Sequence, residues 1–244
     1  MKKILAAICL MSALFGGCAT QGKKTLLAER EAIALVSIIS NGDINWKGEA
    51  SIDERNLGPL VQRALRADPG MAVVTRADEL INSAEQLIRY AMDGSGIILL
   101  ADKEAVLGSK AYGEAKQNRL QEVRGRSGEK VKPEGYRFID YRDKNFAASL
   151  VEETGIRRTM YVEFTFSKAM AAGVGKIGSC RAEVDMSVMI LDSQGKNLYK
   201  KTYSLGSRGT TKASNGVYSQ AEMLSLLESA ITDACYDFLD DLGS

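Results

Sequence analysis

The sequence predicts an α/β (α+β) fold: a single domain with a mixed sheet that ends in a three-stranded antiparallel meander, packed by about three to four helices. In the first half of the chain, apolar runs typical of strands alternate with segments of helical spacing. In the second half, three successive segments alternate apolar and polar residues, which predicts a meander with one buried and one wet face. One sheet with helices packed on it is the simplest arrangement of this order.

The first half reads as strand, helix, strand, helix. Residues 31–40 form an apolar run rich in Ile and Val, typical of a buried strand. Residues 57–67 carry apolar side chains at helical spacing and are ended by Asp68-Pro69-Gly70. Residues 71–75 predict a second short strand. Residues 76–92 predict a second helix with one apolar face.

Residues 93–135 form an irregular insert punctuated by glycines, in which residues 112–123 predict a polar helix. Its later part is a local basic patch, for which a solvated loop is favoured over an interaction site. The basic residues of the patch are Arg119, Arg124, Arg126, Lys130 and Lys132.

After the insert, residues 143–154 predict a helix that Gly155 ends. Strands are expected at 157–167 and 180–192, joined by a loop at 168–179, and the turn 192–195 leads into a third strand. Residues 219–242 predict a long helix that closes the core on the inner face of the meander. Its expected inward residues are Leu224, Leu227, Ile231, Cys235, Phe238 and Leu242. Its acidic residues Asp237, Asp240 and Asp241 are expected on the surface, at the negative end of the helix dipole.

The first 18 residues predict where the protein is sent. Lys2 and Lys3 precede an apolar stretch of twelve residues, about 18 Å as a helix against a bilayer core of about 30 Å, so it predicts a secretory signal. Gly16-Gly17-Cys18 then resembles the lipobox of bacterial lipoproteins. This implies cleavage before Cys18 and a lipid on its thiol; the alternative is a soluble secreted protein cleaved nearby. Ala19 at the second mature position resembles the outer-membrane sorting signal, which implies a place on the periplasmic face.

The expected organisation is therefore a signal peptide at 1–17, a lipid-anchored tether at 18–30 and one domain at 31–244. The net charge of +1 becomes −1 once Lys2 and Lys3 are removed, so no overall field favours nucleic acid. The chain has no His, which excludes Ser-His-Asp and Cys-His triads and His-ligated zinc. We expect no metal and no cofactor. Cys180 and Cys235 either pair in an oxidising periplasm or remain separate buried thiols.

Three further features of the sequence bear on possible chemistry. The segment 173–178, GVGKIG, lacks the Ser or Thr that follows Lys in a phosphate loop, so a flexible connection is favoured. Glu163 and Asp185 point outward on adjacent predicted strands; a pair of catalytic carboxylates is possible in a cleft, but solvated residues are favoured. Trp46, the only Trp, is either a recognition residue or a lid over the sheet.

A resemblance covers the order of elements from about residue 31 to 242. The segment 147–166, AASLVEETGIRRTMYVEFTF, gives a helix, a Gly turn and a strand, and the meander ends in LDSQGKNLYKKTY. This is similar to the periplasmic modules of the curli secretion lipoprotein CsgG, the penicillin-binding-protein activator LpoB and the TolB amino-terminal domain. The resemblance and the lipobox imply a non-enzymatic interaction or assembly module of the cell envelope with a protein partner. A small-ligand-binding lipoprotein and a carboxylate-dependent glycan-cleaving enzyme are the alternatives.

Overall fold

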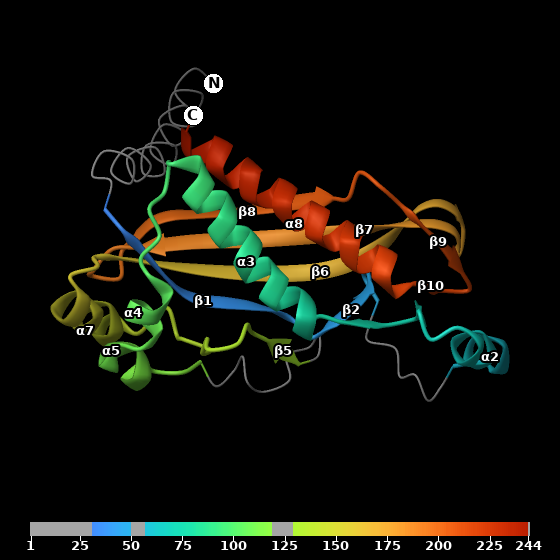
Figure 1. Ribbon diagram of the computed structural model, residues 1–244, viewed down its shortest axis with the longest axis horizontal. Helices are drawn as coiled ribbons and strands as arrows, with labels where there is room; N and C mark the ends of the chain where they lie inside the picture. The colour runs from blue at the N-terminus through green and yellow to red at the C-terminus, as the bar shows by residue number, and fades with distance from the viewer. Residues whose placement is uncertain (1–30, 50–56, 119–128, 244) are drawn as a thin grey trace, which may run out of the picture.

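The computed structural model describes residues 31–49, 57–118 and 129–243, with helices on both faces of one mixed sheet (Figure 1). The main path of the sheet is β3-β10-β9-β7-β6-β1-β5, with β2 added beside β6 and β8 beside β7. The predicted α/β class and single domain are confirmed.

The sheet is mixed because its first two strands run parallel to a later one. β1 (Ile33–Asn41) and β2 (Asp43–Trp46) follow each other along β6 (Arg158–Val174). At the end of β1, the side chain of Asn41 forms the hydrogen bonds to β6 that a backbone amide would otherwise form. Its Oδ1 accepts from the Phe166 N–H and its Nδ2 donates to the Phe166 carbonyl, both at 2.8 Å. Asn41 thus satisfies buried backbone groups where the chain changes strand.

β6, β7 (Ile177–Leu191) and β8 (Asn197–Gly206) form the predicted meander, and the expected inward residues of β6 and β7 are buried. The loop expected at 168–179 is wrong, because the two strands continue to a tight turn at residues 175–176. Gly173 and Gly178 face each other there, at φ +126° and +144°, and a Cβ on either would meet opposing backbone oxygen at 2.1 Å. The glycines of GVGKIG therefore serve a close hairpin crossing.

The short strands differ from expectation. The strand predicted at 71–75 is two separate pieces, β3 (Met71–Ala72) and β4 (Thr75–Arg76), which pair with β10 and β2 respectively. β9 (Thr211–Ser214) and β10 (Val217–Ser219) were not predicted at all. Each piece has only two to four residues, too few for an alternating pattern to show.

Two long helices cover one face of the sheet. α3 (Asp78–Ser95) and α8 (Gln220–Gly243) lie side by side across it, as the front of Figure 1 shows. The prediction for α8 is confirmed, since Leu227, Ile231 and Phe238 are fully buried against the inner face of the meander, and Leu224 is partly buried.

One residue of this helix departs from prediction. Asp241 is half-buried, accepts a 2.5 Å hydrogen bond from the Tyr199 hydroxyl and pairs with Lys201 at 2.9 Å. The expectation that Asp241 is a surface residue is wrong. Asp237 and Asp240 are exposed as expected.

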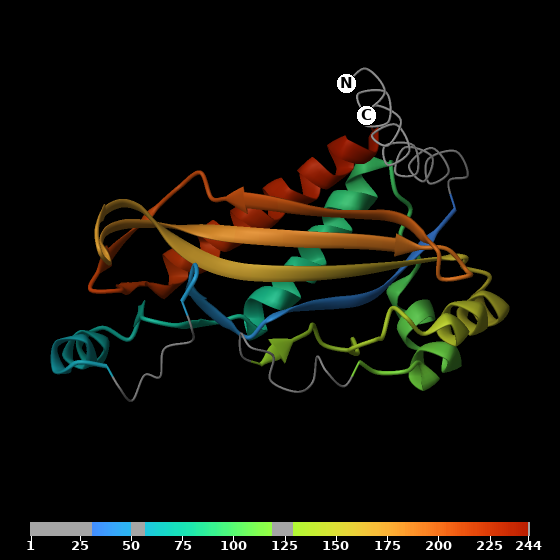
Figure 2. The ribbon, with the colours of Figure 1, turned by 180° about the vertical axis from the view of Figure 1, so that it is seen from behind.

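The other face is covered only near one end of the sheet, as the reverse view in Figure 2 shows. α7 (Lys144–Thr154), α4 (Lys103–Leu107) and α5 (Lys110–Glu114) form a second core there with β1 and β6. Gly155 ends α7 at φ 74°, as predicted. β5 (Lys130–Val131) pairs with the end of β1.

Of the polar helix expected at 112–123, only 112–114 are helical, as the end of α5; the expectation is wrong for 115–118, which are not helical. Tyr112 is drawn into the second core, where its hydroxyl donates to the Val36 carbonyl. Residues 119–123 lie outside the described residues.

The remaining helix, α2 (Pro59–Ala67), matches its predicted range but buries none of its residues; Leu60 is 77% exposed. Cys180 and Cys235 are separate buried thiols, which decides between the two alternatives for them. Within the described residues, no helix is both long and apolar enough to cross a membrane. Cys18 and the predicted signal and tether lie outside those residues.

Candidate functional site

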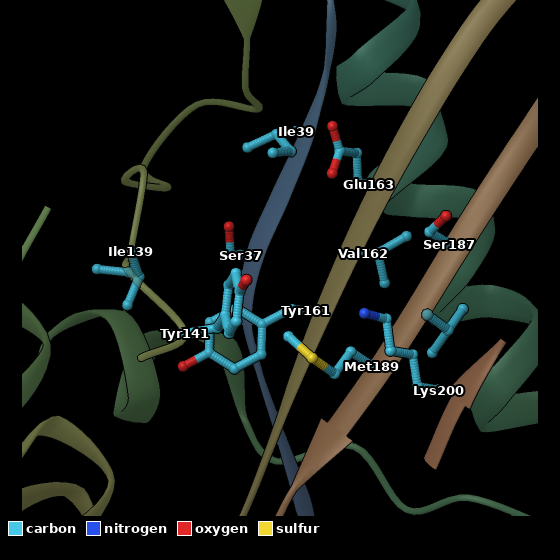
Figure 3. A pocket seen from close by; sticks show the side chains of 11 residues that line it. Ser37, Ile39, Ile139, Tyr141, Tyr161, Val162, Glu163, Ser187, Met189 and Lys200 are labelled. Carbon is cyan, nitrogen blue, oxygen red and sulfur yellow. The ribbon is translucent and has the colours of Figure 1, made fainter. Parts of the chain in front are cut away.

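A pocket of about 180 Å³ opens on the face of the sheet that the long helices leave free (Figure 3). Its floor crosses β1, β6, β7 and β8, and the segment before α7 forms one wall with Ile139 and Tyr141. The remaining lining residues are Ser37, Ile39, Tyr161, Val162, Glu163, Ser187, Val188, Met189 and Lys200.

A β-bulge in β1 brings two of these side chains to the pocket. The β1–β6 register shifts between Leu35 and Ser37, so that Ser37 lies opposite Tyr161 and Ile39 opposite Glu163. Leu35 faces the core between the sheet and the two long helices. With strict alternation from Leu35, Ser37 and Ile39 would face that core as well. The bulge therefore builds this wall of the pocket.

Aromatic and aliphatic groups form most of the lining. The rings of Tyr141 and Tyr161 meet edge to face, with centroids 6.4 Å apart and planes at 77°. Ile39, Ile139 and the Met189 thioether extend this surface. Burial raises the pKa of Tyr161, and the nearby carboxylates of Asp143 and Asp140 add to the rise. Its phenol therefore stays neutral at physiological pH.

Some polar groups of the pocket are already paired with neighbouring side chains, and within the described part of the chain Lys200 is not. Glu163 pairs with Lys130 of β5 at 2.8 Å, and the Ser187 hydroxyl shares a 2.7 Å hydrogen bond with Thr202. Lys200 is exposed, and Figure 3 shows its amine turned toward the pocket. Among the described residues Lys200 has no ion-pair partner.

The carboxylate pair considered for catalysis is not assembled in the pocket. Glu163 lies opposite Ser187, whereas Asp185 lies opposite Thr165 and is not a lining residue. Glu163 is held toward β5 by Lys130. The described residues contain no group of three or more acidic, Cys or His side chains that would hold a metal ion.

The structure describes only part of the predicted basic patch. Lys130 is in the ion pair with Glu163, so it borders the pocket, and the Lys132 amine lies 5.8 Å from the centroid of the Phe138 ring. Arg119, Arg124 and Arg126 lie outside the described residues.

Trp46 is buried, with 4% of its surface exposed, so the interpretation as a surface recognition residue is corrected. The Lys168 and Lys176 amines each lie 5.5 Å from its ring centroid. With both amines against it and 4% of its surface exposed, the Trp46 ring offers almost no surface to a partner.

Lys168 is the functional candidate that the sequence did not reveal. It is 0% exposed, and its amine donates to the Ile44 carbonyl at 2.5 Å and to the Tyr218 hydroxyl at 3.0 Å. Tyr218 in turn shares a 2.8 Å hydrogen bond with Thr75, so one hydrogen-bond network joins β2, β4, β6 and β10. Burial lowers the pKa of Lys168 to about 7.

The pocket itself left only a weak signal in the sequence. Tyr161 and Glu163 stand on the outward side of an alternating strand, where an aromatic residue is unusual for a wet face. Tyr141 comes from an irregular segment, and Ser37 reaches the site only through the bulge. No periodic pattern indicates either contribution.

No family model matches this chain, and neither does any curated protein. Among solved structures, it is similar to protein CT253 of Chlamydia trachomatis, with 8% identity, a TM-score of 0.36 and coverage of 87% of this chain and 93% of that one. The C-terminal domain of LpoB from Salmonella enterica is 11% identical at a TM-score of 0.28, covering 78% and 96%. Lipoprotein GNA1162 from Neisseria meningitidis is 16% identical at a TM-score of 0.32, covering 85% and 99%. The chain thus resembles bacterial lipoproteins in structure, but so slightly that the likeness does not bear on the site.

Proposed function

We propose that this chain is a lipid-anchored lipoprotein of the periplasmic face of the outer membrane, acting as a non-enzymatic interaction module for an envelope protein. The anchor rests on the lipobox-like Gly16-Gly17-Cys18 after a signal-like apolar stretch. The interaction role rests on one observation, the partly apolar pocket on the uncovered sheet face.

The geometry favours binding because the pocket presents aromatic and aliphatic walls without a pair of facing carboxylates. A few polar groups around an apolar cavity is the usual composition of a recognition site. Binding of a small molecule is the second candidate, and the same pocket supports it. Glycan cleavage has the least support, since Asp185 is outside the pocket and Glu163 is engaged by Lys130.

A site-directed photocrosslinking experiment in cells tests the interaction role. A photoreactive phenylalanine analogue is placed at Tyr141, on the pocket wall and 38% exposed, and the adducts are identified by mass spectrometry. Tyr90 on α3, 76% exposed and on the opposite side of the sheet, is the matched control. We expect discrete adducts with an envelope protein from position 141 and none of these from position 90.

Two results would contradict the proposal. One is the same adduct pattern, or none, from both positions in cells that accumulate the protein normally. The other is release of soluble peptidoglycan fragments by the purified protein that disappears in Glu163→Gln, which would assign an enzyme instead.

A further inference from the structure

We propose that the pocket binds the C-terminal end of a protein that finishes in an aromatic residue, with the ring inside the pocket and the terminal carboxylate at Lys200. This inference rests on the proposed interaction function and names the partner's chemistry. It follows from the size of the pocket, from its lining and from the charges at its rim.

The size of the pocket selects a single ring. A cavity of about 150 Å³ with apolar walls is large enough to hold benzene. The pocket here measures about 180 Å³, so it accommodates one phenyl or phenol group with little room to spare. A bicyclic cofactor or a sugar chain would have to lie largely outside it.

The lining is chemically matched to a ring. Tyr141 and Tyr161 already meet edge to face, which leaves ring surface for a third aromatic group to join in the same manner. Met189 adds a polarisable sulfur, which makes favourable contacts with ring edges. Ile39 and Ile139 supply aliphatic contact on the remaining side.

The charges select an anion carrying one negative charge. Lys130 neutralises Glu163 at 2.8 Å, which leaves the Lys200 ammonium as the pocket's uncompensated charge among the described residues. A single ammonium balances a single negative charge, so a carboxylate matches Lys200, whereas a dianion such as a phosphate monoester would keep one charge uncompensated.

The Ser37 hydroxyl marks the polar corner of the pocket. Ser37 is only 3% exposed as a residue, and its side chain lines the pocket. A ligand group that donates to or accepts from this hydroxyl adds a hydrogen bond to the apolar contacts. The backbone N–H of a terminal residue, or its carboxylate, supplies such a group.

The rest of a bound chain has a surface to follow. The outward side of β7 and β8 beside the pocket is free of helices (Figure 2). It carries hydroxyl groups such as those of Ser187 and Thr202. A free aromatic acid would use the ring and the carboxylate alone. A chain end would use this surface as well, and so should bind more tightly.

The test measures fluorescence anisotropy of labelled peptides with the full-length protein in detergent micelles, with empty micelles as background. The probes are a six-residue Gly/Ser peptide ending in Phe, the same peptide with an amidated C-terminus, and the same peptide ending in Ala. We expect the free Phe terminus to bind at least tenfold more tightly than both others. Unlabelled N-acetylphenylalanine should compete only at concentrations at least tenfold higher than the Phe peptide.

Three variants connect this preference to the pocket. Lys200→Gln should reduce the acid-to-amide ratio to near one, whereas Lys212→Gln, an exposed lysine on β9 outside the pocket, should leave it unchanged. Tyr141→Ala should weaken all Phe peptides alike. Circular dichroism of each variant verifies that the fold is retained.

Equal binding of acid and amide, or loss of the preference in Lys212→Gln, would overturn the inference. Equal affinity for N-acetylphenylalanine and the peptide would overturn the assignment to a chain end in favour of a small aromatic acid. In either case, adducts from position 141 in cells would still support the interaction module, so the two proposals fail separately.

Discussion

At the scale of single residues, Lys168 is the most unusual group in the domain. Lysine is rarely buried fully, and here the amine lies 5.5 Å from the Trp46 ring centroid and 4.7 Å from that of Tyr218, with no acidic partner within ion-pairing distance among the described residues. It is retained by two hydrogen bonds and by cation–π contacts with both rings. Cys180, Lys176, Glu49 and Asp43 are the titratable groups that act on it.

This arrangement predicts a pH dependence of stability. Because the pKa of Lys168 is about 7 when folded and has an ordinary value of 10.5, the unfolded chain binds more protons between these limits. Stability should therefore rise with pH, by up to about 1.4 kcal/mol per pH unit. Above about pH 8.5, the raised pKa values of Cys180 and Cys235 oppose the trend, so the informative window is pH 7.0 to 8.5.

Denaturant unfolding of the wild type and of Lys168→Met across that window measures the effect. Methionine retains the length of the side chain without its charge. As the pH rises, the unfolding free energy of the wild type should increase relative to that of Lys168→Met. Parallel profiles would mean that Lys168 stays protonated in the folded protein across this window, so that its pKa is not lowered by burial.

At the scale of elements, the C-terminal turns of α8 are attached to strand β8 of the sheet. Phe238 packs against the Tyr199 and Tyr203 rings of β8, with centroids 5.6 and 6.0 Å away, and Asp241 accepts hydrogen bonds from both hydroxyls. The last turns of the helix are therefore fixed to the sheet by a ring and a carboxylate together.

Thermal and denaturant unfolding of three variants tests this attachment. Phe238→Ala should cost about 3–5 kcal/mol, because it removes a fully buried ring. Asp241→Asn should cost about 1 kcal/mol, because it weakens the acceptor for two tyrosines. Asp237→Asn, an exposed change four residues earlier, should stay within about 0.5 kcal/mol. An Asp241→Asn variant as stable as Asp237→Asn would contradict this account.

Elements long enough to show a repeating apolar pattern were predictable from the sequence. Short strands that form only because a neighbouring strand pairs with them were not. α3, α7, α8 and the inward faces of β6 and β7 follow from apolar spacing alone. β9 and β10 exist because neighbouring strands pair with them, which their few residues do not show. The pocket depends on a bulge at Ser37 and on Tyr141 from an irregular segment, so its assembly is tertiary information.

At the scale of the whole molecule, the long axis orders the functional parts. β1 begins at the end where α8 finishes, and the β6–β7 hairpin and α2 lie at the opposite end (Figure 1). The uncovered sheet face with its pocket lies along the side between them.

The anchor is tested with Cys18→Ala in cells fed labelled palmitate. The wild type should incorporate label and fractionate with the outer membrane. The variant should carry no label and accumulate as an unprocessed or soluble form. If the variant is found in the membrane fraction to the same extent as the wild type, the lipid at Cys18 is not what holds the protein there.

The position of β8 has one more consequence, for self-association. Among the described strands it pairs only with β7, so its far side is an open edge of ten residues. Open edges invite pairing with strands from other molecules, and lysine is a common protection against this. Lys201 at the middle of β8 is paired with Asp241, whereas Lys200 beside it has no ion-pair partner among the described residues. An edge-to-edge pairing of two copies would bring the Lys200 charges of both β8 strands to the same seam, which disfavours extended sheets of the protein.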